Sequence, residues 1–570
     1  MARPRGQRKV GGMNDIRLLD CQVLVVGAGP TGLVLAAELL ARGINVRLID
    51  QGDGVALQSR AIGIHARTLE VLDTMGQAER FVERGQVVRH LNFYSEGRRL
   101  VSLEFGRCGS RFGFLLDLPQ DQTQRLLRAR IAELGGVVED RTELISLTAG
   151  REAVIAVVRD RGGSAVRIQT VTVGYVVGCD GAHSRVRREL DLTFHGQPYP
   201  QDWLLADVLL DWDLPEDAVH AFFRHDGLPA IFFPMREHRW RLTLPFAGNR
   251  NRQAPTLTEI QELTDQRAPR PVTVSDPTWL ANFGCHRRSA SAYRRGRVLL
   301  AGDAVHIHSP AGGQGLNTGI MDAHNLGWKL ALVASGRAPD ALLDSYGGER
   351  RPVAEDVLKL THALVHYGTM SHPVKRRVRD LVVPALGRSP VIQRRGARRI
   401  SQVYVAYPPG PLTRPDRGRG TPRAGQRMPD VEVQADGQAT TLHRVLRGGR
   451  HVLVIPAAQA GLLSDSALRP YREDLDIVTQ ARAPSDRGLV VLVRPDGHVA
   501  ARGGPGRMQA VTGYLHDLFT EPARVAVPTA AADSTSTAPP STHASVGDIV
   551  RNRRTVRTGA VGACPDAGWT

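Results

Sequence analysis

The residues best suited to chemistry form a glycine-rich turn near the N-terminus. The segment Gly27-Ala-Gly29-Pro30-Thr31-Gly32 follows the continuously apolar run Val23–Val26 and precedes an Ala- and Leu-rich stretch with helical spacing, residues 33–42. Between a strand and a helix, such a turn binds the pyrophosphate of a dinucleotide. The first glycine permits the tight turn, the second lets the backbone approach the phosphates, and the third allows close helix packing. The helix N-terminus adds N–H groups and a partial positive charge.

An acidic residue completes this pattern. Asn45–Ile49 has the composition of a second strand, and Asp50 follows it, 21 residues after Gly29. A carboxylate in this place accepts hydrogen bonds from a ribose hydroxyl. The spacing therefore predicts dinucleotide binding, while FAD and NAD both remain open.

Further motifs narrow this choice. In chain order they are Ser59-Arg60-Ala61, Gln120, Gly178-Cys-Asp180-Gly181-Ala-His-Ser-Arg185, Leu300-Ala-Gly-Asp303-Ala304, Pro310-Ala-Gly-Gly313-Gln-Gly315-Leu316-Asn317-Thr-Gly319 and Asp322-Ala-His-Asn-Leu-Gly-Trp-Lys329. With the glycine turn, this set resembles the FAD-dependent aromatic hydroxylases of the p-hydroxybenzoate hydroxylase type. Within that family, it is similar to the branch that acts on phenols and aromatic polyketides and carries a C-terminal thioredoxin-like domain. The resemblance covers about residues 20–520.

The resemblance implies roles for individual residues. Asp50 would bind the adenosine ribose, Arg60 the pyrophosphate region and Gln120 the ribityl chain of FAD; a surface arginine is the alternative for Arg60. Asp180-Gly181 matches a fingerprint associated with both FAD and NAD(P)H. Asp303 would hold a flavin ribose or ribityl hydroxyl, and a helix cap is its alternative. Residues 310–319 would pass beside the isoalloxazine ring. The expected FAD-binding residues are Gly27, Gly29, Pro30, Thr31, Gly32, Asp50, Arg60, Gln120, Asp180, Gly181, Asp303, Pro310, Gly313, Gly315, Leu316 and Asn317.

The resemblance also implies that the cofactor carries out the chemistry. NADH or NADPH would reduce FAD, the reduced flavin would react with O2, and a C4a-hydroperoxide would deliver one oxygen atom to an electron-rich aromatic ring. No side chain has to act as a nucleophile, and the sequence contains no Ser–His–Asp or metal-spaced cluster. Catalytic residues therefore stay unassigned. The candidates are His306 and Pro310, with structural hydrogen bonding near the ring as the alternative for His306.

A strand-rich segment is the expected substrate site. Arg239–Phe246 alternates strictly, with Trp240, Leu242 and Leu244 on one face, which is typical of an antiparallel sheet with one covered face. Aromatic residues concentrate in the same region, so the sheet could hold a flat apolar ligand; ordinary sheet core is the alternative. The predicted substrate-contacting residues are Phe222, Phe232, Met235 and Trp240.

The expected fold is α/β, with a Rossmann-like FAD-binding domain, an antiparallel-sheet substrate domain and a C-terminal thioredoxin-like domain. The expected boundaries are a disordered arm at 1–19, a discontinuous FAD-binding domain at 20–200 and 286–400, the substrate domain at 201–285, a linker at 401–425, the thioredoxin-like domain at 426–520 and a disordered tail at 521–570.

Composition and charge exclude several functions. The formal net charge is +17, and residues 367–423 hold 13 Lys and Arg against two Asp, but few aromatics and no recognition motif. We expect a solvated basic face and no nucleic-acid partner. The five cysteines are scattered without a C-x-x-C pair, which excludes a disulfide scaffold and a structural zinc site and suits a reducing cytoplasm. Residues 426–520 contain no cysteine, so thiol redox chemistry there is excluded and a packing or oligomer role is expected.

We expect no targeting segment and no membrane-spanning segment in this sequence. The basic residues at 3–9 precede Val10-Gly-Gly-Met13 rather than an apolar run, so we expect no secretory signal. The uncharged run Cys21–Ala37 is short for a bilayer and is broken by the glycine turn. The chain is therefore expected to be a cytoplasmic monomer or homodimer without a membrane or metal partner.

Three functions remain open at this point. The leading one is a monooxygenase that takes a phenolic or polycyclic, antibiotic-like aromatic substrate. The second is an FAD-dependent reductase or dehydrogenase of the same fold that transfers no oxygen. The third is a flavin-binding partner protein without turnover. Neither the substrate nor a preference for NADH or NADPH follows from the sequence.

Overall fold

The computed structural model describes residues 19–55, 61–224, 229–246, 254–307, 312–368, 373–414, 421–458, 467–480, 490–503 and 508–519. All of them belong to one compact unit, Met1–Arg524. Apart from Leu19, the predicted N-terminal arm lies outside the described residues, as do the predicted tail, Arg60 and Pro310.

The first layer is a mostly parallel sheet with the order β17-β18-β11-β1-β2-β8. The central strand β1 runs parallel to β11 and β2, and its Val and Leu side chains are buried, as is usual for a parallel sheet covered on both faces. An antiparallel extension, β10 and β9, continues from β11. The strands are β1 (Cys21–Val26), β2 (Val46–Ile49), β8 (Val138–Glu139), β9 (Thr142–Ala149), β10 (Val154–Asp160), β11 (Arg167–Gly178), β17 (Arg294–Arg295) and β18 (Val298–Leu300).

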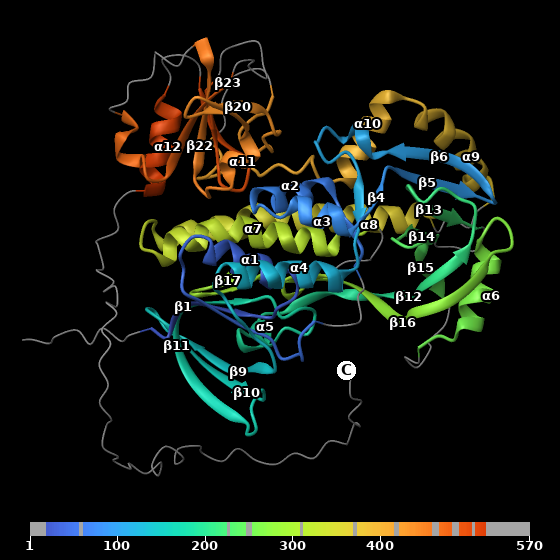
Figure 1. Cartoon of the computed structure of the whole chain (residues 1–570), viewed down its shortest axis with the longest axis horizontal. Helices are drawn as coiled ribbons and strands as arrows, with labels where there is room; N and C mark the ends of the chain where they lie inside the picture. Colours follow the sequence, from blue (N-terminus) through green and yellow to red (C-terminus); the bar gives the residue numbers. More distant parts are fainter. Residues whose placement is uncertain are drawn as a thin grey trace, which may run out of the picture. The chain divides into compact units, whose positions relative to one another are not determined.

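Helices cover one face of this sheet. In Figure 1, α1 (Pro30–Leu40), α4 (Gln120–Glu133) and α7 (Gly315–Ala334) lie side by side along it. Helix α1 begins at Pro30, whose fixed φ and missing N–H suit a first helical position. Gly327 of α7 permits close packing on α1, since a Cβ there would lie 2.7 Å from the Cβ of Glu38. The remaining helices of this part are α2 (Ala66–Thr74), α3 (Ala78–Arg84), α5 (Arg185–Glu189) and α8 (Asp344–Gly368).

The second layer is a largely antiparallel eight-stranded sheet with the order β19-β16-β12-β15-β14-β13-β5-β6. It extends beyond the predicted substrate segment 201–285, because β5 and β6 come from the earlier part of the chain and β13 pairs in parallel with β5. Helix α6 (Leu257–Arg267) packs on one face and begins with a capping box of Thr256 and Glu259. The strands are β5 (His90–Ser95), β6 (Arg98–Glu104), β12 (Phe194–Asp211), β13 (Ala218–Phe223), β14 (Ala230–Pro234), β15 (Arg239–Phe246), β16 (Thr273–Ala290) and β19 (His306–Ile307).

Both faces of this sheet are covered, not one as the alternation predicted. Trp240, Leu242 and Leu244 enter the apolar cluster beneath α6 as expected. On the other face, however, Arg241 is only 1 % exposed. Its guanidinium is buried because Nε and Nη2 bind both carboxyl oxygens of Asp207 at 2.7 and 2.6 Å. A small third sheet, β3 (Gly63–Ile64), β7 (Leu115–Asp117) and β4 (Gln86–Val88), contributes to the wall opposite that face.

Among its described residues, the C-terminal part has a six-stranded sheet and two α-helices, in agreement with the predicted thioredoxin-like fold class. Its strand order is β21-β20-β23-β22-β24-β25, with β22 parallel to β23 and antiparallel to β24. The elements are β20 (Glu432–Ala435), β21 (Gln438–Thr441), α11 (Leu442–Leu446), β22 (His451–Pro456), β23 (Leu475–Gln480), β24 (Val490–Val493), β25 (Val499–Gly503) and α12 (Gln509–Phe519).

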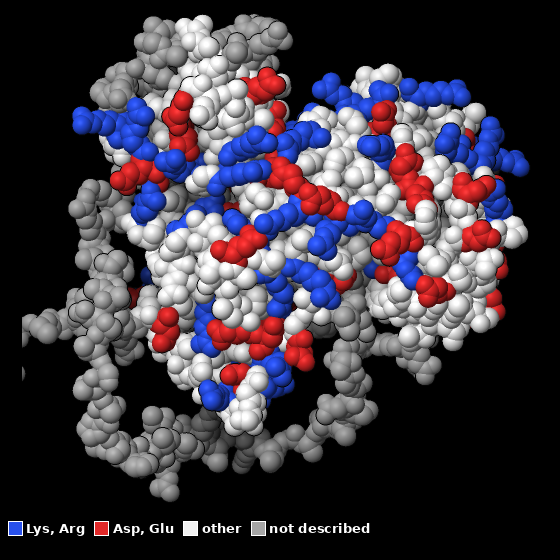
Figure 2. Space-filling view, in the orientation of Figure 1, with Lys and Arg blue, Asp and Glu red and all other residues white. Residues whose placement is uncertain are grey.

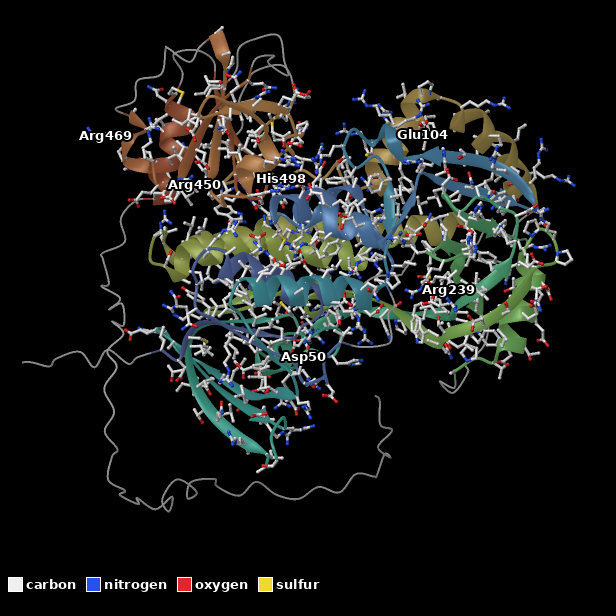
Figure 3. All side chains as sticks on the ribbon, viewed as in Figure 1. Asp50, Glu104, Arg239, Arg450, Arg469 and His498 are labelled. Carbon is white, nitrogen blue, oxygen red and sulfur yellow. The ribbon has the colours of Figure 1, made fainter. Side chains whose placement is uncertain are left out.

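Buried ion pairs join this part to the helices of the first layer. Nη2 of Arg494, directly after β24, binds Oε2 of Glu349 in α8 at 2.8 Å. Lys329 of α7 binds the same oxygen at 2.7 Å. On α2, Glu70 pairs with Arg427. Figure 3 places His498 where the C-terminal sheet meets α2. These contacts fit the packing role expected from the absence of cysteine.

Two helices carry much of the basic stretch. They are α9 (Pro373–Gly387) and α10 (Pro390–Ile400); Arg377, Arg394 and Arg395 are exposed on them, and Arg388 is exposed between them. On the face shown in Figure 2, Lys and Arg are interspersed with Asp and Glu. No helix among the described residues has the length and apolar character needed to cross a bilayer.

Candidate functional site

The glycine turn leaves space and hydrogen-bond donors where a phosphate group would bind. Gly27 has a φ of +102°, and a Cβ there would lie 2.5 Å from the carbonyl oxygen of Cys179. A Cβ on Gly32 would lie 1.9 Å from the carbonyl oxygen of Gly27, so only glycine fits. In front of Gly29, by contrast, a Cβ would meet nothing within 4 Å. No side chain caps α1, so its first N–H groups stay available for an anion.

Asp50 is tied to the glycine turn. Asp50, labelled in Figure 3, follows β2, and one of its carboxyl oxygens accepts from the N–H of Ala28 at 2.6 Å. The other accepts from the N–H of Gly52 at 2.7 Å. Each oxygen keeps a lone pair for a further donor. Because Asp50 is only partly buried, a ribose hydroxyl can reach it.

The segment around Asp303 meets the same turn. A Cβ on Gly302, whose φ is +61°, would lie 2.6 Å from Oγ1 of Thr31, and one on Gly319 would lie 2.4 Å from that oxygen. These three residues therefore touch. Asp303 is exposed, although its neighbours Gly302 and Ala304 are buried. The expected ribose- or ribityl-binding carboxylate thus lies beside the glycine turn and open to a ligand.

Asp180 has a structural task beside the turn. One carboxyl oxygen accepts from the N–H groups of Arg185 and Val186 at 2.6 and 3.0 Å, which caps α5. Burial raises the pKa of this carboxyl above its ordinary value, against the lowering effect of these bonds. Gly181 has a φ of +73°. The Asp180-Gly181 pair lies under the turn, since a Cβ on Gly27 would come within 2.9 Å of the Asp180 Cα.

Gln120 is placed where α4 begins. Its N–H donates to the carbonyl oxygen of Ala61 at 3.2 Å, and its Oε1 accepts from the N–H of Ala61 at 3.4 Å. Gln120 therefore lies beside the segment that follows Arg60, although Arg60 itself is outside the described residues.

The loop before α7 is held by Asn317 and His65. The Asn317 amide accepts from the N–H of His65 at 2.9 Å and donates to the carbonyl oxygens of Gly63 and Gly313 at 2.8 and 2.7 Å. The side chain of Asn317 thus fixes the conformation of the loop, and its backbone N–H is the group that can bind a ligand. With Gly315 and Leu316, it forms the first turn of α7, whose N–H groups lack intrahelical acceptors. Burial lowers the pKa of His65 to about 4, so its ring is neutral at neutral pH.

His306 belongs to a buried ion-pair network. Its Nε2 lies 2.7 Å from Oδ2 of Asp322, whose Oδ1 accepts from Nε of Arg350 at 2.7 Å. The positive charge of Arg350 lowers the pKa of the Asp322 carboxyl despite its burial. The His306 side chain is 1 % exposed. This geometry favours the hydrogen-bonding role over the catalytic one, while Pro310 lies outside the described residues.

An apolar cavity adjoins this loop. It lies between the eight-stranded sheet and the β3-β7-β4 sheet and contains about 760 Å³ of unfilled space, part of it open to solvent. Gly312 and His65 form the wall next to the α7 loop. Ring and aliphatic side chains form most of the rest, among them Phe93, Phe105, Trp203, Phe223, Ile231 and Phe233. This lining suits an aromatic ligand.

The predicted substrate residues do not line this cavity. Phe222, Phe232 and Trp240 pack in the cluster beneath α6, on the opposite face of the sheet. Met235 lies in the turn after β14 and is not part of the wall. Successive strand residues point to opposite sides and both sides here are apolar, so the sequence pattern does not tell which side borders the cavity. The adjacent residues Phe223 and Phe233 line the cavity instead.

Two polar groups near the cavity escaped the sequence analysis. Arg241 donates through Nη1 to the carbonyl oxygen of Ala61 at 3.1 Å, so it links the substrate sheet to the segment after Arg60. Asp117, at the end of β7, is buried. The strict alternation of Arg239–Phe246 puts Arg241 on the face opposite Trp240, but it does not reveal its partner Asp207. No sequence pattern around Asp117 indicates that this residue is buried.

Comparisons with known proteins agree with this geometry. Residues 20–361 match the family model of the FAD-binding domain. Residues 421–522 match the family model of the aromatic-ring hydroxylase C-terminal domain.

Individual relatives cover most of the chain. It is 35 % identical to 6-methylpretetramide 4-monooxygenase of Streptomyces rimosus, over 88 % of this chain and 94 % of that protein. It is 34 % identical to a rifampicin monooxygenase of Streptomyces venezuelae, over 84 % and 95 %. The solved structure of an anhydrotetracycline hydroxylase from Streptomyces rimosus matches with a TM-score of 0.72 and 32 % identity, over 88 % of this chain and all of that one.

Proposed function

Because the chain belongs to the FAD-dependent aromatic hydroxylases, we propose that it uses NADH or NADPH and O2 to hydroxylate a phenolic or polycyclic aromatic substrate of polyketide or antibiotic type. One observation carries this proposal: the apolar cavity shares Gly312 and His65 with the loop before α7. A flat ligand in the cavity would thus lie next to a bound flavin ring. The relatives named as monooxygenases of 6-methylpretetramide and of rifampicin support a substrate of this type.

The residues of this chain have supporting tasks in the reaction. Bound FAD supplies the oxidation, with electrons from NAD(P)H and a C4a-hydroperoxide as the expected oxygen donor. The glycine turn and Asp50 would hold the pyrophosphate and ribose. The first N–H groups of α7 would stabilise negative charge on the flavin. The apolar walls would exclude water and so limit loss of oxygen as hydrogen peroxide.

Substrate-dependent NAD(P)H consumption tests this proposal. The purified chain loaded with FAD is mixed with NADH or NADPH and a panel of phenols, anthraquinones and naphthoquinols, and hydroxylated product is quantified. We expect at least one aromatic compound to accelerate NAD(P)H consumption and to be hydroxylated. After anaerobic reduction, mixing with O2 should give the transient absorbance of a flavin hydroperoxide. Turnover that proceeds equally well without O2 would contradict the proposal and indicate a reductase.

A further inference from the structure

The outer side of α9 is apolar, although the exposed side of a surface helix is normally polar. In the part of the chain that the structure describes, six of the eleven exposed large apolar side chains lie within residues 378–392. They are Val378, Leu381, Val382, Leu386, Val391 and Ile392. The four on α9 follow the spacing i, i+3, i+4 and i+8, so they form one stripe along the helix. Such a concentration of exposed apolar surface indicates an interaction site.

Arginines border this stripe. Residues 373–400 contain nine Lys and Arg and one acidic residue, Asp380. The charge of Asp380 is compensated, because its Oδ1 binds Nη2 of Arg379 at 2.8 Å. Four further arginines are exposed and form no ion pair with an acidic residue that the structure describes; they are Arg377, Arg388, Arg394 and Arg395. We call these four arginines and the six apolar residues the α9–α10 face.

Apolar and basic side chains of this face lie side by side. Arg377 precedes Leu381 by four residues, and Arg394 and Arg395 follow Val391 by three and four residues. Residues at these spacings are neighbours on one side of a helix. A partner that covers the apolar stripe therefore also meets the guanidinium groups.

The α9–α10 face lies near the apolar cavity. Figure 1 shows both helices beside β5 and β6, at one edge of the eight-stranded sheet. The guanidinium of Arg379 in α9 lies 5.6 Å from the ring centre of Phe223, which lines the cavity. Ile400, the last residue of α10, lines the cavity itself. A partner on this face would thus be close to the cavity.

The charge of the face decides between three kinds of partner. A symmetric contact with a second copy of this chain would bring the arginines of one copy close to those of the other. A nucleic acid would pair with the arginines but leave the apolar stripe in water. A bilayer with anionic lipids satisfies both parts, because apolar side chains enter the acyl boundary while arginines contact the headgroups.

We propose that the α9–α10 face docks on the surface of a membrane that contains anionic lipids. This inference goes beyond the proposed reaction and does not depend on it. The expectation of no membrane partner rested on the absence of a spanning segment, and a helix that lies on the surface needs none. Docking would bring the cavity close to the lipid phase, in which apolar aromatic compounds concentrate.

Sedimentation with vesicles tests the proposal on the full-length, FAD-loaded chain. One set of vesicles contains phosphatidylcholine alone, and the other contains equal parts of phosphatidylcholine and phosphatidylglycerol. We expect the protein to partition at least about tenfold more strongly onto the anionic vesicles, and high salt should weaken this binding. Equal partitioning onto the two sets, or none onto either, would overturn the proposal.

The double variant Leu381→Ser, Leu386→Ser tests the apolar stripe. Partitioning onto the anionic vesicles should fall about tenfold or more, because two side chains no longer enter the acyl boundary. Val166→Ser with Ile168→Ser is the matched control, since Ile168 is 70 % exposed near β11 and Leu381 is 77 % exposed. The control should partition as wild type does, and both variants should keep the wild-type Tm and bound flavin. Unchanged partitioning in the leucine variant would contradict docking of the stripe and leave only attraction between charges.

The double variant Arg394→Gln, Arg395→Gln tests the basic part of the face. Partitioning onto the anionic vesicles should fall about thirtyfold. Arg151→Gln with Arg188→Gln removes two other exposed arginines and changes the net charge equally, but should lower partitioning less than about twofold. Equal losses in the two arginine variants would indicate a response to net charge and overturn the proposal. A wild-type dimer that binds no vesicles and dissociates in the leucine variant would assign the face to a second copy instead.

Discussion

At the scale of single residues, the nucleotide site depends on glycines, which have no side chain to fill the space around the turn. Gly27 and Gly32 leave no room for a Cβ, because backbone atoms of neighbouring segments lie within 2.5 Å of its position. Gly29 differs, because the space in front of it is empty and its φ of −68° suits any residue. Substitutions at different glycines of this turn can therefore test the stability of the fold and the binding of the ligand separately.

Gly29→Ala should weaken FAD binding without weakening the fold. A methyl group there meets no protein atom but occupies the space in which the backbone would approach the phosphates. We expect FAD affinity to fall about tenfold, equivalent to about 1.4 kcal/mol, and the Tm of the FAD-free protein to remain within about 2 °C. Fluorescence titration with FAD and thermal unfolding measure the two quantities.

Two variants control this prediction. Gly32→Ala should lower both stability and FAD affinity, because its Cβ would overlap the carbonyl oxygen of Gly27. Gly348→Ala, on the exposed side of α8 with nothing within 4 Å of a Cβ, should leave FAD affinity unchanged. Unchanged FAD affinity in Gly29→Ala would show that no phosphate group approaches this turn.

At the scale of elements, buried charges fasten the C-terminal sheet to α7 and α8. Arg494 is fully buried and binds Glu349 and Asp496, and Lys329 binds Glu349 from the other side. In such a network, removal of one charge leaves its partners buried and uncompensated.

Arg494→Leu should therefore destabilise the protein strongly. We expect the free energy of unfolding to fall by about 3–5 kcal/mol, measured by denaturant titration. Arg450→Ala is the matched control, since Arg450, labelled in Figure 3, pairs with Asp476 at the surface of the same sheet. That change should cost less than about 1 kcal/mol. Equal losses in the two variants would contradict a docking role for Arg494.

The sequence predicted those elements whose conformation is determined by residues close together in the chain. The turn at Gly27–Gly32 and the helix that follows it were predicted from local spacing, and the structure places Asp50 and Asp303 around the same turn. The choice between Phe222 and Phe223 was not local. Both faces of β13 are apolar, so the pattern shows the alternation but not which face meets the cavity. The pairing of Arg241 with Asp207 depends on strands 34 residues apart in the chain, and no single segment reveals it.

At the scale of the whole molecule, buried histidines link stability to pH. Burial lowers the pKa of His65 and His498 to about 4 and that of His451 to about 3. In the unfolded chain these groups titrate near pH 6.5. Between pH 6.5 and 4 the unfolded state therefore binds more protons than the native state, and stability falls as the pH falls.

The free energy of unfolding should consequently drop by at least about 2 kcal/mol between pH 7.5 and pH 5, measured by denaturant titration. His451→Gln should reduce this drop, because it removes one of the groups that titrate only on unfolding. His238, which is exposed and has a pKa raised by Glu216, acts in the opposite direction, and His238→Gln should not reduce the drop. Equal stability at the two pH values would contradict the buried, neutral state of these rings.

The central claim is that the FAD-loaded chain transfers an oxygen atom from O2 to an aromatic ring. Mass spectrometry of the product formed under 18O2 tests it most directly, with NAD(P)H and the best aromatic substrate from the screen. We predict that each hydroxylation adds one 18O atom, and that product formed in H2(18)O under ordinary O2 carries no label. Product that acquires its oxygen from water, or that forms at the same rate without O2, would contradict the account.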